Sequence, residues 1–131
     1  MSIELMSIEQ VCEEVRISLQ SDNVSLRELR MFALASSPEE YEEVSMPIEQ
    51  TVERIKQVIR CLLGEDIEIG DSEDDPKKFV IWRGSIDERV ERARPLIEKY
   101  EKMLCTEYDN SFCYAFAFWL CYRRNIDEYE S

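Results

Sequence analysis

No histidine occurs among the 131 residues, and this absence removes several kinds of chemistry. Histidine is the usual general base near neutral pH and the commonest metal ligand. Catalytic triads built on histidine are therefore excluded, as are zinc sites that include it. Carboxylate pairs fall on the exposed faces of the expected helices, and no histidine is present to activate a cysteine. We predict that the protein is not an enzyme and uses no cofactor.

Glycine and proline are also scarce, with three and four residues respectively, which indicates few turns and long regular elements. No apolar run approaches the roughly 20 residues that cross a bilayer. The most apolar run, FCYAFAFWLCY at residues 112–122, predicts a buried helix instead. The first ten residues, MSIELMSIEQ, have neither the basic patch nor the apolar stretch of a secretory signal.

Cysteine is present in an odd number, five, without any C-x-x-C pair. Together with the lack of a secretory signal, this pattern predicts a reducing environment and a cytoplasmic protein. Most of the thiols are expected to be buried as small hydrophobic side chains, and the sequence does not place a disulfide.

Hydrophobic residues recur at helical spacing through most of the chain, and the fold class that this predicts is mainly α. Capping boxes, in which a serine precedes glutamine or glutamate by three positions, begin at Ser7, Ser25 and Ser85. We predict a single-domain helical bundle of about five helices over residues 1–131. Pro95 predicts a kink or a break near Arg94. The helices are expected at residues 7–19, 25–35, 47–63, 85–104 and 111–124, with a shorter one starting at Ser37.

Residues 65–84 break the helical pattern. Ile67 and Ile69 alternate with polar neighbours, and FVIW at residues 79–82 is β-branched and aromatic. Joined by an acidic loop at residues 70–78, these segments predict one short β-hairpin at about residues 66–82. A two-stranded hairpin is marginal in isolation, so its apolar face is expected to pack on helices.

Acidic residues outnumber basic ones by 29 to 16, for a formal net charge of −13. Most of the imbalance lies in residues 1–53, which contain twelve carboxylates and three arginines. Phosphate binding needs a net basic face, so direct binding to nucleic acid or to an anionic membrane surface is disfavoured. A basic protein partner is compatible with this charge.

Two acidic clusters are the candidate partner-binding sites, one around Tyr41 and one in the hairpin loop. The loop does not match a calcium site, because Pro76 stands where an EF-hand needs glycine and Trp82 where it needs glutamate, and we predict no metal site. The alternative for both clusters is a solvated surface, as a helix first turn and a hairpin tip. The candidate partner-binding residues are Glu39, Glu40, Tyr41, Glu42, Glu43, Asp71, Glu73, Asp74 and Asp75.

These features predict a small acidic protein that acts by protein–protein binding. The favoured function is an inhibitor or immunity (antidote) protein that covers a basic target, such as a nuclease or another nucleic-acid-binding protein. The alternative is a helical adaptor or assembly module, which includes the case of a homodimer. Similar helix starts at Ser7, Pro47 and Ser85 have the spacing of HEAT-type helical pairs, although any capped amphipathic helix shares their pattern.

Overall fold

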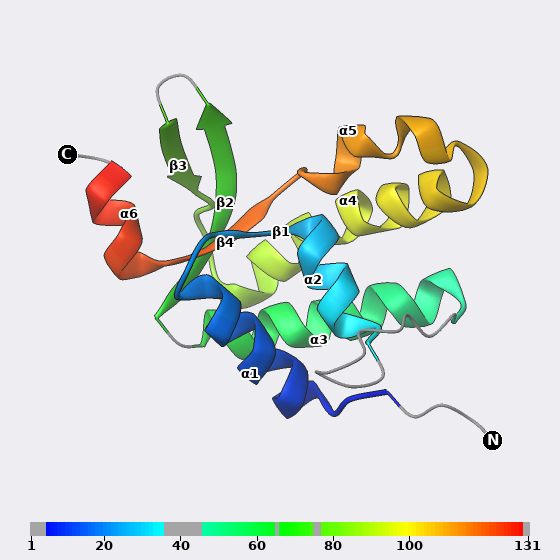
Figure 1. Cartoon of the computed structure of the whole chain (residues 1–131), viewed down its shortest axis with the longest axis horizontal. Helices are drawn as coiled ribbons and strands as arrows, with labels where there is room; N and C mark the ends of the chain where they lie inside the picture. Colours follow the sequence, from blue (N-terminus) through cyan, green and yellow to red (C-terminus); the bar gives the residue numbers. More distant parts are fainter. Residues whose placement is uncertain (1–4, 36–45, 65, 75–76, 130–131) are drawn as a thin grey trace.

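The structure, a computed structural model, describes residues 5–35, 46–64, 66–74 and 77–129. This part of the chain is mostly helical and contains a small antiparallel sheet (Figure 1), so the mainly α prediction is confirmed in its coarse form. The helices are α1 (Ile8–Leu19), α2 (Leu26–Ala33), α3 (Ile48–Leu63), α4 (Ile86–Thr106), a 3₁₀ turn (Tyr108–Asn110), α5 (Phe112–Ala115) and α6 (Arg123–Tyr129). The strands are β1 (Val24–Ser25), β2 (Ile67–Asp74), β3 (Lys77–Ile81) and β4 (Trp119–Tyr122).

Local capping determines where three of the helices begin. Ser7 and Ser25 form complete capping boxes, in which serine and the residue three positions later each accept a hydrogen bond from the other's backbone N–H. At Ser85 the serine half of the box is formed, with the Glu88 N–H donating to Ser85 Oγ at 3.1 Å. The predicted starts of α1, α2 and α4 are therefore confirmed.

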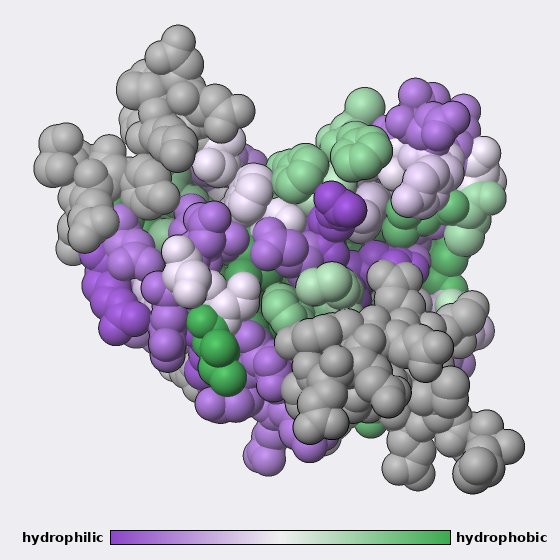
Figure 2. Space-filling view, viewed as in Figure 1, coloured by the Kyte–Doolittle hydropathy of each residue, from purple (hydrophilic) through white to green (hydrophobic). Residues whose placement is uncertain are grey.

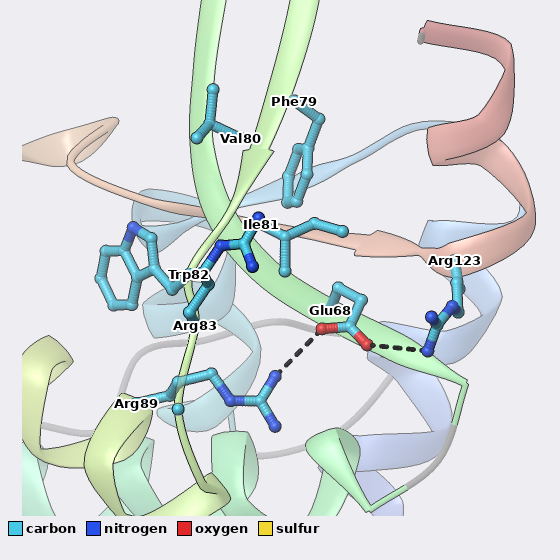
Figure 3. A pocket seen from close by; sticks show the side chains of 9 residues that line it. Glu68, Phe79, Val80, Ile81, Trp82, Arg83, Arg89 and Arg123 are labelled. Atoms are coloured by element: carbon cyan, nitrogen blue, oxygen red, sulfur yellow. Dashed lines mark hydrogen bonds and ion pairs between the residues drawn. The ribbon is translucent and has the colours of Figure 1, made fainter.

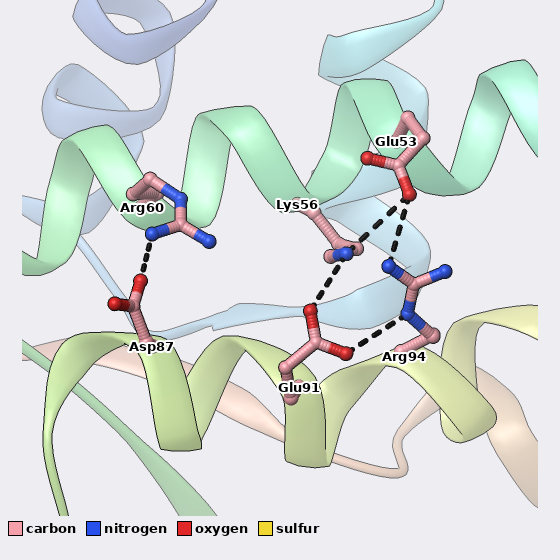
Figure 4. Close-up of polar contacts among 6 residues, drawn as sticks. All are labelled: Glu53, Lys56, Arg60, Asp87, Glu91 and Arg94. Carbon is pink, nitrogen blue, oxygen red and sulfur yellow. Dashed lines mark hydrogen bonds and ion pairs between the residues drawn. The ribbon is translucent and has the colours of Figure 1, made fainter.

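α4 continues through Pro95 as one helix, so a break near Arg94 is excluded. Ion pairs join α4 to the neighbouring α3 at this point (Figure 4). Lys56 Nζ lies 2.9 Å from Glu91, and Arg94 lies 3.0 Å from Glu91 and 3.1 Å from Glu53. Hydrogen bonds from Lys56 and Arg94 lower the pKa of Glu91. Tertiary contact thus supports the helix where proline removes one backbone hydrogen bond.

The sheet has the strand order β1-β4-β2-β3, and every neighbouring pair is antiparallel. β2 and β3 form the predicted hairpin, with Gly70 opposite Ile81, but residues 70–74 and 77–78 lie in its strands, so the predicted loop at residues 70–78 is wrong. β4 lies between β1 and β2, where Leu120 is opposite Val24 on one side and Ile69 on the other. Pairing with β4 gives the hairpin the support that two strands alone lack.

The predicted helix at residues 111–124 is wrong. In its place the chain forms the short helix α5, the strand β4 and the start of α6. The run is apolar on every side, a pattern that a buried helix shares with a strand covered on both faces. The second case applies here, because Leu120 packs in the main core and Cys121 in a separate cluster, each with 0% exposed surface.

Helices α1 to α4 bury the main core together with one face of the sheet. On the other face, α6 contributes Ile126 to a smaller cluster with Phe79 and Cys121, against which Ile81 and Trp119 pack. Alternate residues of β4 thus enter different clusters, as the pleat of a strand requires. The short α6 covers only part of this second face. A hollow lies beside it along β3.

Candidate functional site

Most of the residues predicted to bind a partner lie outside the described residues. These are Glu39, Glu40, Tyr41, Glu42, Glu43 and Asp75. Asp71 is described, and its carboxylate accepts a hydrogen bond from Trp82 Nε1 at 3.1 Å and lies 3.8 Å from Arg92 Nη2. The Asp71 side chain is 47% exposed, so it orients the indole while remaining partly open to solvent.

Glu73 and Asp74 lie near the end of β2, opposite Lys78 and Lys77 in the register of the hairpin. In this register the two positions face lysine positions of β3 rather than the other predicted acidic residues.

A hollow of about 630 Å³ lies beside β3, between the start of α4 and the start of α6, and we call it the basic groove (Figure 3). Three arginines and one glutamate line it, which gives the lining a net positive charge in a chain of −13. Guanidinium groups are well suited to bind carboxylates and phosphates. The lining residues are Glu68, Phe79, Val80, Ile81, Trp82, Arg83, Gly84, Arg89 and Arg123.

The arginines of the basic groove differ in how firmly they are held. Glu68 lies 3.0 Å from Arg89 Nη1 and 3.7 Å from Arg123 Nη1, as Figure 3 shows. Arg89 also donates through Nε to the Ser85 carbonyl at 3.3 Å, and its side chain is only 13% exposed. Arg83 is exposed and forms no ion pair with any residue in the described ranges. The guanidinium group of Arg89 is thus held in place by the protein, whereas that of Arg83 can bind a ligand.

Two glycines set the path of β3 past the basic groove. A Cβ at Gly70 would lie 2.2 Å from the Val80 carbonyl oxygen, so glycine lets the β2 and β3 backbones approach closely. Gly84 has a φ of +117°, which favours glycine, and it turns the chain from β3 toward α4. Between them Trp82 is buried, with the Arg92 guanidinium 4.2 Å above its ring. The wall of the basic groove is therefore positioned by close backbone packing and by a fixed indole.

A second hollow, of about 400 Å³, lies among α2, α4 and the segment around α5. Tyr108 and Phe116 line it and are 66% and 45% exposed. Arg27 also lines it and places its guanidinium 5.8 Å from the ring of Phe112, which is 56% exposed. We call this hollow and its three exposed aromatic residues the aromatic hollow. Figure 2 shows apolar surface gathered over α5, and such exposed apolar clusters mark interaction sites.

An ion pair between α2 and α4 fixes the shape of the aromatic hollow. Arg30, which lines the hollow, donates to the Glu101 carboxylate, and the two side chains are only 19% and 5% exposed. Met31 and Leu104 add apolar lining from the same two helices. The hollow is therefore framed by rigid helices, with the exposed aromatic residues at its rim and on α5.

The prediction that most thiols are buried is wrong. The exposed thiols are Cys61, Cys105 and Cys113, and all five cysteines are free. Cys113 is exposed because it lies on the short α5 instead of within a buried helix. Burial, with a smaller contribution from Asp22, raises the pKa of Cys121 to about 11, so this thiol stays protonated and is a poor nucleophile.

Neither hollow is apparent from the sequence. The arginines of the basic groove are separated by up to 40 positions in the sequence, between Arg83 and Arg123. Arg123 lies near the others because α6 directly follows β4, which is part of the sheet. The one local signal is Arg83-Gly84-Ser85, an arginine at a turn between strand and helix. The aromatic hollow was missed because Phe112 and Phe116 were assigned to a buried helix.

Comparisons with known proteins found no match, whether with protein-family models, curated proteins or solved structures. No helix in the described ranges has both the length and the apolar character needed to span a bilayer. Within the same ranges no group of three or more cysteine or acidic residues is arranged to hold a metal ion. The function is therefore argued from the geometry of the two hollows.

Proposed function

We propose that the protein acts by binding a basic protein partner, which docks on the aromatic hollow. The observation that carries this proposal is the exposure of Tyr108 and Phe116 in the lining of one concave surface, with the exposed Phe112 next to the lining residue Arg27. Aromatic side chains at the centre of an interface commonly supply most of the binding free energy. Complete burial of one phenylalanine side chain stabilises by about 1.5–3 kcal/mol, so three half-exposed rings can anchor a partner.

A basic partner is favoured by two properties of the chain. The net charge of −13 attracts cationic surfaces and raises the rate of encounter. Aromatic ring faces can also bind a cation; Tyr108 is 66% exposed, whereas Arg27 of the chain itself already lies 5.8 Å from the centre of the Phe112 ring. A lysine or arginine of the partner would thus gain from both the overall charge and the local aromatic contact.

If the surface of the partner that becomes covered is the one with which it binds its own ligand, the protein acts as an inhibitor. A nuclease or another nucleic-acid-binding protein has such a basic surface, and a bound acidic protein would block access to it. We further propose that this occurs in the cytoplasm, which is supported by three exposed free thiols in one small chain.

The experiment compares capture of partners by the immobilised protein and by two matched variants. The first variant carries Tyr108→Ala, Phe112→Ala and Phe116→Ala, and the control carries Ile17→Ala, which removes a side chain that is 51% exposed on α1. We expect a basic protein to bind the wild type and the control, and to bind the triple variant at least about a hundredfold more weakly. Equal binding to all three forms would refute docking at the aromatic hollow.

The helical adaptor or homodimer remains the second candidate, because exposed aromatic residues can also bind a second copy. Sedimentation of the protein alone separates the two cases. A stable dimer that the triple variant loses would favour self-association. A monomer that abolishes the activity of its basic partner at equimolar concentration would favour the inhibitor.

A further inference from the structure

The free edge of β3 provides a second binding surface that does not depend on the aromatic hollow. β3 is last in the order β1-β4-β2-β3, so it pairs with β2 on one side and with no described strand on the other. An unpaired edge presents backbone donors and acceptors to which an extended peptide can add as a further strand.

The register shows which backbone groups of β3 point outward. Trp82 N–H donates to the facing residue Ile69 at 2.9 Å, so these two residues form a hydrogen-bonded pair. Hydrogen-bonded pairs alternate along an antiparallel ladder with pairs whose backbone groups point away from each other. Counting back from Trp82, the pairs that contain Ile81 and Phe79 are of the second kind. The N–H and C=O groups of Ile81 and Phe79 are therefore directed to the free edge.

α6 packs on the face of the sheet, where Ile126 contacts the side chain of Phe79. Figure 3 looks onto the edge, with β3 in front of β2 and the side chains of Phe79 and Ile81 directed toward α6. Residues 79–84 all line the basic groove, so the groove follows the edge and continues past the end of β3.

The charge of the basic groove selects the kind of peptide. Arg83, Arg89 and Arg123 surround the edge, and Glu68 is the one carboxylate in the lining. A basic peptide would be repelled, and pairing with a second copy would bring together two chains that each carry a net charge of −13. The net negative charge of the whole chain affects a bound peptide less than the nearby arginines do, because salt screens exposed charges beyond about 8 Å at physiological ionic strength.

We propose that β3 binds an extended acidic peptide, which adds to its free edge and places carboxylates against Arg83, Arg89 and Arg123. Backbone hydrogen bonds to Phe79 and Ile81 supply affinity that is independent of the peptide's sequence. The arginines supply the preference for acidic side chains.

The test uses the peptide acetyl-Glu-Val-Glu-Val-Glu-amide, titrated calorimetrically into the full-length protein. Its glutamates lie on one face of an extended strand. A matched peptide with glutamine at the three glutamate positions keeps the backbone and removes the charge. We expect the glutamine peptide to bind at least about tenfold more weakly, since it would lose its ion pairs with the arginines. Equal binding, or no binding of the acidic peptide at millimolar concentration, would overturn the proposal.

N-methylation distinguishes strand addition from simple charge attraction. The amides of alternate residues point to opposite edges of an extended peptide. One analogue is therefore methylated at its glutamate nitrogens and another at its valine nitrogens. We expect one analogue to lose binding about tenfold or more while the other keeps it, because only one edge can pair with β3. Identical affinities of the two analogues would refute strand addition.

Variants of the protein test the assigned arginines. We expect the double variant Arg83→Gln, Arg123→Gln to bind the acidic peptide about tenfold more weakly, and Lys102→Gln, an exposed change farther along α4, to leave binding unchanged. Circular dichroism of each variant checks that the fold is retained. If the protein alone sediments as a dimer that Ile81→Pro dissociates, the edge binds a second copy and the proposal is wrong.

Discussion

Replacing Gly70 by alanine should destabilise the hairpin that β2 and β3 form. The new Cβ would lie 2.2 Å from the Val80 carbonyl oxygen and 2.9 Å from Cε1 of Phe79, which is 1% exposed and cannot swing into solvent without losing its packing. β3 must therefore move away from β2. Disturbing about two backbone hydrogen bonds costs about 1–3 kcal/mol, and overpacking adds about 1–3 kcal/mol. We expect the free energy of unfolding to fall by roughly 2–6 kcal/mol.

The other two glycines are matched controls in the same assay, urea unfolding followed by circular dichroism. A Cβ at Gly64 would meet only the Cys61 carbonyl oxygen at 3.6 Å, so Gly64→Ala should change the free energy of unfolding by less than about 0.5 kcal/mol or raise it slightly. Gly84→Ala should cost about 1–2 kcal/mol because its φ of +117° strains any other residue. If Gly70→Ala were as stable as Gly64→Ala, the close approach of the two strands would be refuted.

Three other outcomes test the buried groups. A thiol reagent should modify three cysteines rapidly in the native protein and the remaining two only after unfolding; equal rates for all five would contradict the burial of Cys12 and Cys121. Burial, with Asp22 adding to it, raises the pKa of Cys121 from 9.0 to about 11, so the unfolded chain ionises first and stability should decline as the pH rises between these values. Urea unfolding at several pH values measures this, and Cys121→Ala should show a weaker decline. Glu101→Gln should lower stability by about 1.5–3 kcal/mol in the same assay, because the hydrogen bond from Arg30 would lose its charged acceptor at a largely buried position; an unchanged midpoint would refute a stabilising role for this ion pair.

The parts of the fold that could be predicted from the sequence are those governed by local interactions. Ser7 and Ser25 begin helices because side chains three positions apart complete hydrogen bonds within one turn. The hairpin was predictable because alternation and β-branched residues act over a few positions. Pro95 shows the limit of this reasoning, since the helix persists across it where α3 and the ion pairs of Arg94 hold it.

β4 was not predictable because its conformation depends on residues far away in the sequence. Leu120 is a strand residue only because Val24 and Ile69 lie on either side of it, and its own neighbours in the sequence would also suit a buried helix. The wrong prediction of a helix at residues 111–124 also affected the prediction of the candidate site. Once Phe112 and Phe116 were placed in a buried helix, their exposure could not be foreseen, and neither could the arrival of Arg123 beside Arg89.

Of the predicted partner-binding residues, those around Tyr41 stay a prediction. Asp71 was expected on a free loop, and it lies instead against Trp82 and Arg92, with half of its surface exposed. The sequence could indicate where carboxylates are dense, but it could not indicate which of them the hairpin register places opposite lysines. A surface charge pattern is set by tertiary contacts as much as by composition.

The central position of β4 has a consequence for how the chain is made. β1 and β2 are synthesised well before residues 119–122. They belong to one sheet only because β4, which these late residues form, lies between them. During translation Val24 lacks its strand partner, and β2 can pair only with β3, until this late segment leaves the ribosome. The emerging chain is therefore expected to need protection by chaperones during that interval, and any stop codon upstream of residue 119 should give a product that aggregates.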